Sequence, residues 1–204
     1  MLQFGKKVSY RPVLVSLLIG LIVGSLVGAF FQTSIGGFLV TAVIFLTIFL
    51  GHYLVTLPNT FAYWEVDKDV IKYSNMEKKT HRLAMMLLPT TMNNLTTIDM
   101  HDLKTIILHG SYDDPKEMPF SMFYNLYLVA FSASISMNKN PMYVTLITRE
   151  GHEINLNLSR DYIYDPETTF KKIDELVEIL NHTPIKVINQ IQNNHSHHLN
   201  LKTN

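Results

Sequence analysis

The sequence predicts an α+β protein in which an N-terminal transmembrane helical hairpin precedes an antiparallel β domain capped by a C-terminal helix. Three observations carry this prediction. Residues 12–64 contain no Asp, Glu, Lys or Arg. From residue 61 onward, apolar and polar residues mostly alternate, as in half-buried strands. From Phe170 to Leu180, apolar residues instead recur at helical spacing.

The uncharged stretch has room for two membrane-spanning helices, approximately residues 13–31 and 37–57. The break between them, "QTSIGG", is short enough to force a tight turn. Lysines and Arg11 flank the pair on both outer sides, and basic flanks stay in the cytoplasm. We therefore expect a multi-pass protein of the cell membrane with both termini cytoplasmic, and with only residues 32–36 on the far side.

A secretory signal peptide is the alternative for the first apolar segment, because Lys6 and Lys7 form a basic start. The segment lacks an A-x-A-like cleavage site and is longer than a signal core, so we favour the hairpin.

Small residues form a stripe on the first helix, where Ser16, Gly20, Gly24 and Gly28 are four residues apart. Such a stripe allows close approach of a second helix in lipid. The partner is either another membrane protein or copy of the chain, or the second helix, which offers Gly37, Thr41 and Gly51. We favour the second helix because the short turn already places it alongside. Tyr53, Tyr63 and Trp64 are expected to anchor the inner end of the hairpin at the interface.

The sequence divides into a basic N-terminus (1–11), the hairpin (12–58), a β domain (59–184) and a polar tail (185–204) expected to be disordered. Within the β domain, "FAYWEVDKDVIKYSN" predicts two strands joined near Asp67, and "MYVTLITREGHEINLNLS" predicts a hairpin turning at Gly151. "HRLAMMLL", "TTIDM" and "KTIILHG" are further strand candidates. The helix that follows opens with Asp165 as N-cap and Pro166 in its first position.

Residues 118–138 are again uncharged, which raises the alternative of a third membrane segment. In "SASISM" serines alternate with apolar residues, which indicates a half-buried strand. An interfacial or buried segment over residues 120–131 stays open.

A transmembrane hairpin followed by "YWEVDKDVIKYSN", "TTIDMHDLKTI", "TREGHEINLNL" and a helix opening "DPETTFKKIDELVEIL" resembles the bacterial pleckstrin-homology-like (PH-like) domains that follow one or two membrane helices. The order of elements is similar over residues 60–182. The resemblance implies a bent antiparallel sandwich capped by the helix, and a binding or scaffolding role. The uncharged stretch between Gly110 and Pro141 departs from that pattern.

No pattern in the chain predicts catalysis or a cofactor. "HEINL" lacks the second histidine of a zinc-protease helix, since Leu156 stands in its place. "DMHD" offers Asp99, His101 and Asp102 without a third ligand from elsewhere, and we interpret it as a solvated corner. "HSHH" belongs to the tail. The slightly acidic extramembrane part argues against nucleic acid.

Two functional hypotheses follow, each with the lipid bilayer as one partner. In the first, the chain is a membrane adaptor or regulator whose β domain binds a protein partner or the membrane surface through Lys72, Lys78, Lys79 and Arg82. In the second, an accessory or immunity-type protein acts through its glycine stripe on a transporter or pore, or self-associates. An enzyme is the third and weakest, because it lacks a site.

Overall fold

The computed structural model describes residues 1–67, 69–92, 94–112, 137 and 141–193, which form two compact units. We call them the hairpin unit, Lys6–Tyr63 with Tyr73–Thr96, and the sheet unit, Met1–Gly5 with Trp64–Lys72 and the chain from Thr97 onward. Both units are discontinuous in the sequence. The chain enters the hairpin unit, leaves it, and returns to it after two strands.

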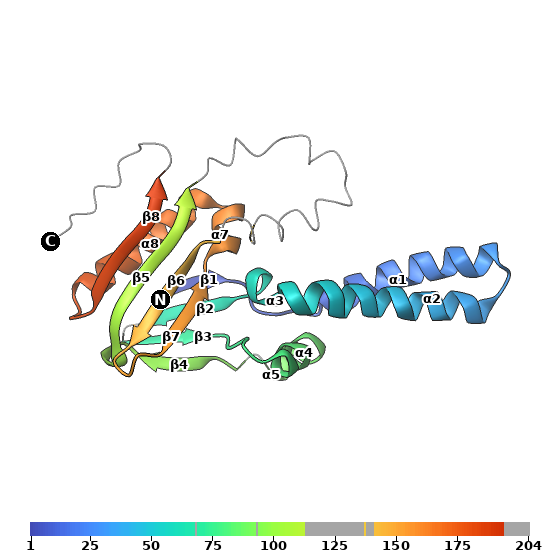
Figure 1. Cartoon of the computed structure of the whole chain (residues 1–204), viewed down its shortest axis with the longest axis horizontal. Coiled ribbons are helices and arrows are strands. Elements are labelled where there is room, and N and C mark those ends of the chain that lie inside the picture. Colours follow the sequence, from blue (N-terminus) through green and yellow to red (C-terminus); the bar gives the residue numbers. More distant parts are fainter. Residues whose placement is uncertain (68, 93, 113–136, 138–140, 194–204) are drawn as a thin grey trace. The chain divides into compact units, whose positions relative to one another are not determined.

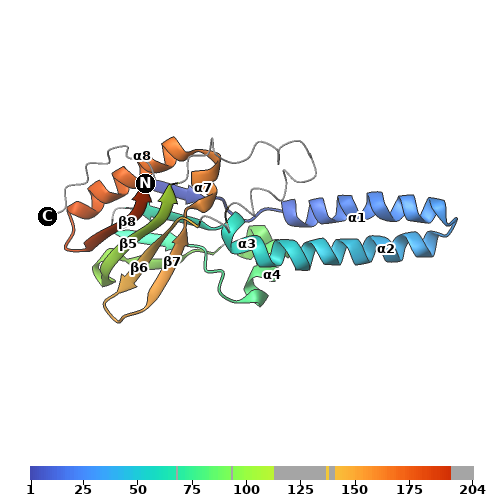
Figure 2. The ribbon, with the colours of Figure 1, turned by 45° about the horizontal axis from the view of Figure 1, so that its top comes forward.

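The hairpin unit contains two long apolar helices that run side by side (Figures 1 and 2). The first is α1 (Arg11–Phe30). The second is continuous over Ser34–Thr60 and is composed of α2 (Ser34–Leu46), the π-helical η1 (Thr47–Tyr53) and α3 (Leu54–Thr60). Both are long and apolar enough to cross a membrane, with mean hydropathies of 2.6 and 2.3. The turn between them is shorter than expected because Gln32 adopts a φ of 50° and Thr33 caps α2 by accepting the Gly36 N–H.

The sheet unit is built on two four-stranded sheets (Figure 1). The first has the order β1-β2-β3-β4, with β1 at Leu2–Gly5, β2 at Tyr63–Asp67, β3 at Val70–Tyr73 and β4 at Thr96–Asp99. The second has the order β7-β6-β5-β8, with β5 at Leu103–Tyr112, β6 at Tyr143–Thr148, β7 at Glu153–Asn157 and β8 at Lys186–Asn193. The short 3₁₀ turn η2 (Met100–Asp102) joins β4 to β5.

Several predicted strands are confirmed. The β2–β3 pair and the β6–β7 hairpin lie where the sequence predicted them, and Gly151 adopts the positive φ, 87°, that the tight turn requires. Core burial fixes the register of these strands: Trp64 and Val66 of β2 and Val144 and Leu146 of β6 are each at most 1% exposed. β2 departs from strict alternation, because Tyr63 and Glu65 are buried as well. The "SASISM" strand lies outside the described residues except for Met137, which is buried.

Three expectations about elements were wrong. "HRLAMMLL" forms the helix α4 (Lys79–Leu87), followed by α5 (Pro89–Met92), because its apolar residues are good helix formers that do not alternate. Residues 186–193 of the expected disordered tail form β8, which runs parallel to β5. The N-terminus was expected to be only a basic flank, yet its first residues form β1.

Because β8 follows the long helix, that helix is not the last element and the second sheet is mixed. A parallel pairing needs a crossover connection, and two helices supply it here: α7 (Ser159–Tyr164) and α8 (Pro166–Asn181). α8 buries Ile173, Leu176, Val177 and Leu180 and packs along β8 (Figure 2).

Strand β1 contacts β2 on one side and side chains of α7 and α8 on the other. Phe4 is 1% exposed and stacks on Trp64 of β2 with ring centroids 4.1 Å apart. On the other side, the Gly5 N–H donates to the Asp161 carboxylate at 2.7 Å, and the Lys172 ammonium donates to the Gln3 carbonyl at 2.9 Å. Side chains of α7 and α8 therefore satisfy backbone groups that an edge strand would otherwise leave open.

Asp165 caps α8 and gives the sheet unit a pH-dependent stability. Hydrogen bonds from the Thr168 side chain and backbone N–H hold the pKa of Asp165 below 3.8. Because this carboxyl has a lower pKa in the folded state, its contribution is present above pH 3.8 and is lost as the pH falls through the folded value.

We predict that Asp165→Asn lowers the melting temperature at neutral pH, since it keeps the acceptor but removes the charge at the helix N-terminus. The difference from the wild type should close as the pH falls below 3.8. Fluorescence of Trp64, the single tryptophan, reports unfolding of the sheet unit. Asp165→Ala, which also loses the acceptor, should be less stable than Asp165→Asn at every pH. A wild-type advantage that is independent of pH would contradict this account.

Candidate membrane interface

The glycine stripe of α1 lies directly against α2. A Cβ on Gly24 would overlap the Thr41 hydroxyl and come within 2.5 Å of the Gly37 carbonyl oxygen. A Cβ on Gly20 would meet the Thr41 carbonyl oxygen at 2.9 Å, and one on Gly28 would meet the Gly37 Cα at 3.3 Å. Approach this close is available only to residues without a side chain, so the stripe serves the contact inside the hairpin.

Ser16 and Thr41 complete this helix contact. Ser16 is fully buried, and its hydroxyl donates to the Pro12 carbonyl at 2.7 Å, while the Thr41 hydroxyl donates to the Gly37 carbonyl at 3.0 Å. Both polar groups are satisfied within their own helix, as an apolar surrounding requires. Gly51 does not take part, contrary to the sequence expectation, because a Cβ at this position would have no neighbour within 4 Å.

At the end of the hairpin opposite its turn, a buried cluster joins four segments of the hairpin unit: the residues before α1, the second helix, the loop at Met76 and α4. Met85 and Met86 of α4 are fully buried against Phe49, Leu57 and Phe61. Val8, from the segment before α1, belongs to the same cluster, with Tyr53 and Leu54 packed beside it. The cluster fixes α4 to the base of the hairpin, and we call it the basal cluster.

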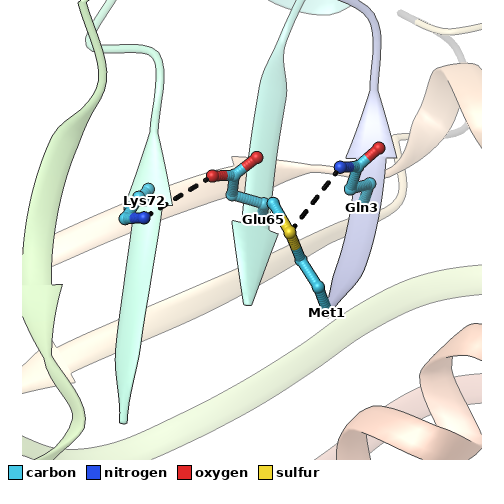
Figure 3. Close-up of polar contacts among 4 residues, drawn as sticks. All are labelled: Met1, Gln3, Glu65 and Lys72. Atoms are coloured by element: carbon cyan, nitrogen blue, oxygen red, sulfur yellow. Dashed lines mark hydrogen bonds and ion pairs between the residues drawn. The ribbon is translucent and has the colours of Figure 1, made fainter. Parts of the chain in front are cut away.

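The four predicted basic residues do not form one surface. Lys72 belongs to the sheet unit, where its ammonium lies 3.9 Å from the Glu65 carboxylate on the neighbouring strand (Figure 3). Arg82 donates through Nε to the Met76 carbonyl and through a terminal nitrogen to the Glu77 carbonyl, so it fixes the loop before α4. Lys78 and Lys79 are exposed at the start of α4.

The three predicted aromatic anchors, Tyr53, Tyr63 and Trp64, lie in different surroundings. Trp64 is 1% exposed, and its Nε1 donates to the Asn157 carbonyl at 3.2 Å. It is a core residue of the sheet unit, so it cannot serve as an interfacial anchor. Tyr63 is 8% exposed, with the Lys7 ammonium 4.7 Å from its ring centroid. Tyr53 packs on the basal cluster.

The remaining sequence candidates are "DMHD", "HEINL" and "HSHH". Asp99 accepts the His101 N–H at 2.9 Å, which makes "DMHD" a local turn. Within the part of the chain that the structure describes, no three His, Asp or Glu side chains are placed to hold a metal. "HEINL" lies in β7, and "HSHH" lies outside the described residues.

Leu87 and Leu88, which the sequence pattern does not single out, are 47% and 51% exposed at the end of α4 beside the hairpin base. The apolar run that ends before Pro89 could have drawn attention to them. The run must be recognised as a helix, however, before its methionines can be assigned to a buried face and its leucines to an exposed one.

No family model matches this chain, and neither a curated protein nor a solved structure matches it.

We predict that Gly24→Leu unfolds or splays the hairpin, because its side chain meets the Gly37 backbone, which has no side-chain freedom to yield. Thermal unfolding of the detergent-purified chain, followed by far-ultraviolet circular dichroism, should show a large loss of helix stability. Gly51→Leu is the matched control and should cost far less, since its Cβ enters open space. Equal losses for both variants would contradict close packing as the reason for Gly24, and helix propensity could not explain them, because leucine is a better helix former than glycine.

Proposed function

We propose that this chain is an integral membrane adaptor or regulatory protein that is anchored by the hairpin and binds a protein partner through its sheet unit. The observation that carries the proposal is the position of the hairpin in the chain. It connects β1 to β2, which are hydrogen-bonded neighbours in one sheet. Because both strands belong to one folded unit, the two ends of the hairpin must emerge on the same side of the membrane.

The distribution of basic residues supports the cytoplasmic side of the membrane for both ends of the hairpin. Lys6 and Lys7 precede α1, Arg11 is its first residue, and Lys78 and Lys79 lie at the start of α4 in the same unit. Since basic flanks are retained in the cytoplasm, the sheet unit is cytoplasmic in this proposal.

The charge of the sheet unit favours a protein partner over the membrane surface. Its segments carry eleven Lys and Arg against sixteen Asp and Glu, a net charge of −5. An acidic domain is repelled by an anionic lipid surface and by nucleic acid. The PH-like resemblance points in the same direction, toward binding, although the parallel β8 departs from the antiparallel sandwich that it implies.

The runner-up is an accessory or immunity-type protein that acts through its membrane helices. That hypothesis drew on a free glycine stripe, and the stripe is used inside the hairpin. What α1 offers to other molecules is a row of exposed leucines, which lipid also covers.

The topology can be tested directly, because the chain has no cysteine and any introduced cysteine is unique. We predict that Ser34→Cys, at the exposed first residue of α2 next to the hairpin turn, reacts with a membrane-impermeant maleimide added outside intact cells. Glu150→Cys, in the exposed β6–β7 turn, should react only after permeabilisation. Labelling of both positions from outside, or of Glu150→Cys alone, would contradict the proposed orientation.

The partner-binding surface is tested by photo-crosslinking in native membranes. A photoreactive residue at Leu18 or Leu26, 59% and 67% exposed on α1, is compared with one at the exposed Lys104 or Glu175 of the sheet unit. We predict a protein adduct from the sheet positions. An adduct confined to the α1 positions would favour the runner-up, and no protein adduct from any position would contradict both hypotheses.

A further inference from the structure

We propose that α4 and the basic segment before α1 form an interfacial collar that binds the headgroups of anionic phospholipids, with Leu87 and Leu88 inserted at the acyl boundary. The inference rests on the proposed membrane insertion of the hairpin. It names a lipid partner for the hairpin unit, whereas the proposed function assigns a protein partner to the sheet unit.

The lengths of the two helices place α4 at the headgroup level. The 20 residues of α1 span about 30 Å, which matches the hydrocarbon core. The second helix has 27 residues and is about 10 Å longer. In the antiparallel register set by the glycines, this extra length falls at α3, alongside the segment containing Val8. α4 packs on α3 and on the start of α1, so it lies where the hairpin passes from hydrocarbon to headgroups.

The exposed residues of α4 suit that depth. Met85 and Met86 face the basal cluster and are fully buried. Leu87 and Leu88, at the C-terminal end, are about half exposed, and Val55 of the neighbouring helix α3 is 66% exposed. Lys78 and Lys79 stand at the opposite end of the helix. This arrangement suits a helix that is inclined to the membrane plane, with its leucines toward the acyl boundary and its lysines at the anionic surface.

The charge of the hairpin unit complements anionic lipid. Its segments carry six Lys and Arg and one acidic residue, Glu77, a net charge of +5 that is opposite to that of the sheet unit. Arg82 is bound to backbone carbonyls and is not part of the collar. The cations left to face lipid phosphates are Lys6, Lys7, Arg11, Lys78 and Lys79.

A pocket beside α4 offers room for a headgroup. It has a volume of about 350 Å³ and lies between the start of α4 and the segment before β4. Two cationic or titratable side chains, Lys78 and His81, line it together with the amides of Asn75 and Asn94. Glu77 also lines the pocket and favours a headgroup that carries hydroxyl or amine groups besides its phosphate.

The test uses the full-length chain in lipid nanodiscs of phosphatidylcholine, alone or mixed with phosphatidylglycerol. Leu88→Cys carries an environment-sensitive fluorophore, and nitroxide lipids labelled near the headgroup act as quenchers. We expect a blue-shifted emission that these lipids quench. Lipid retained after purification should be several-fold enriched in phosphatidylglycerol over the mixture supplied, and the double variant Lys78→Gln, Lys79→Gln should lose most of this enrichment.

The matched control is Lys104→Gln, Lys186→Gln, which removes two exposed charges from the sheet unit and should keep the enrichment. Inorganic phosphate should not displace the lipid; displacement would identify a free-phosphate site and overturn the proposal. A fluorophore at residue 88 that is water-exposed in nanodiscs but shielded in native membranes would show that a protein covers α4, and this too would overturn it.

A separate experiment, extraction of membranes with alkaline carbonate, distinguishes failure of the proposed function from failure of the collar. If alkaline carbonate extracts the chain from membranes, the hairpin is not inserted and the proposed function fails. If the chain resists extraction and residue 88 is water-exposed, or the enrichment is absent, only the collar is refuted.

Discussion

The hydrogen-bonded pairing of β1 with β2 is the constraint on which the rest of the structure depends. The connection between these two neighbouring strands is long and apolar, and it consists of α1, α2, η1 and α3. The connection must return to its starting point, because Phe4 and Trp64 stack in one core and the edge of β1 is closed by Asp161 and Lys172. A hairpin satisfies this condition, whereas an odd number of membrane crossings would place the two strands on opposite sides.

The same constraint makes close packing within the hairpin necessary. In lipid the helices gain little from hydrophobic burial, so their association depends on backbone approach. Gly24 and Gly37 supply it at the middle of the contact, and the basal cluster supplies conventional side-chain burial at the inner end. The hairpin is thus stabilised by two different kinds of contact: close backbone approach along the helices and side-chain burial at their inner end.

Charge separates the two units as clearly as packing does. The hairpin unit carries a net charge of +5 and the sheet unit −5, although the whole chain is neutral. Averaged over the chain, this separation is invisible; residues 6–63 alone carry +3, and grouping residues 73–96 with them raises the net charge of the unit to +5. It agrees with the two proposed partners, anionic lipid at the base of the hairpin unit and a protein at the acidic sheet unit.

The sequence by itself determined the features that depend on local pattern: two long apolar helices, the β2–β3 and β6–β7 pairs, and the Asp165 cap of α8. Each follows from neighbours within a few residues, where periodicity and turn chemistry act directly. Tertiary structure alone decided the rest. From the sequence, Trp64 was expected to be an interfacial anchor, but it is buried against Phe4, which lies sixty positions earlier in the chain. β1 has only four residues and β8 lies in a segment rich in Asn and Gln, so neither was recognised without the distant strands that they join. Met85 and Leu87 have similar hydrophobicity, and only the position of the hairpin base buries one and exposes the other, because burial is a property of the partner surface and not of the residue.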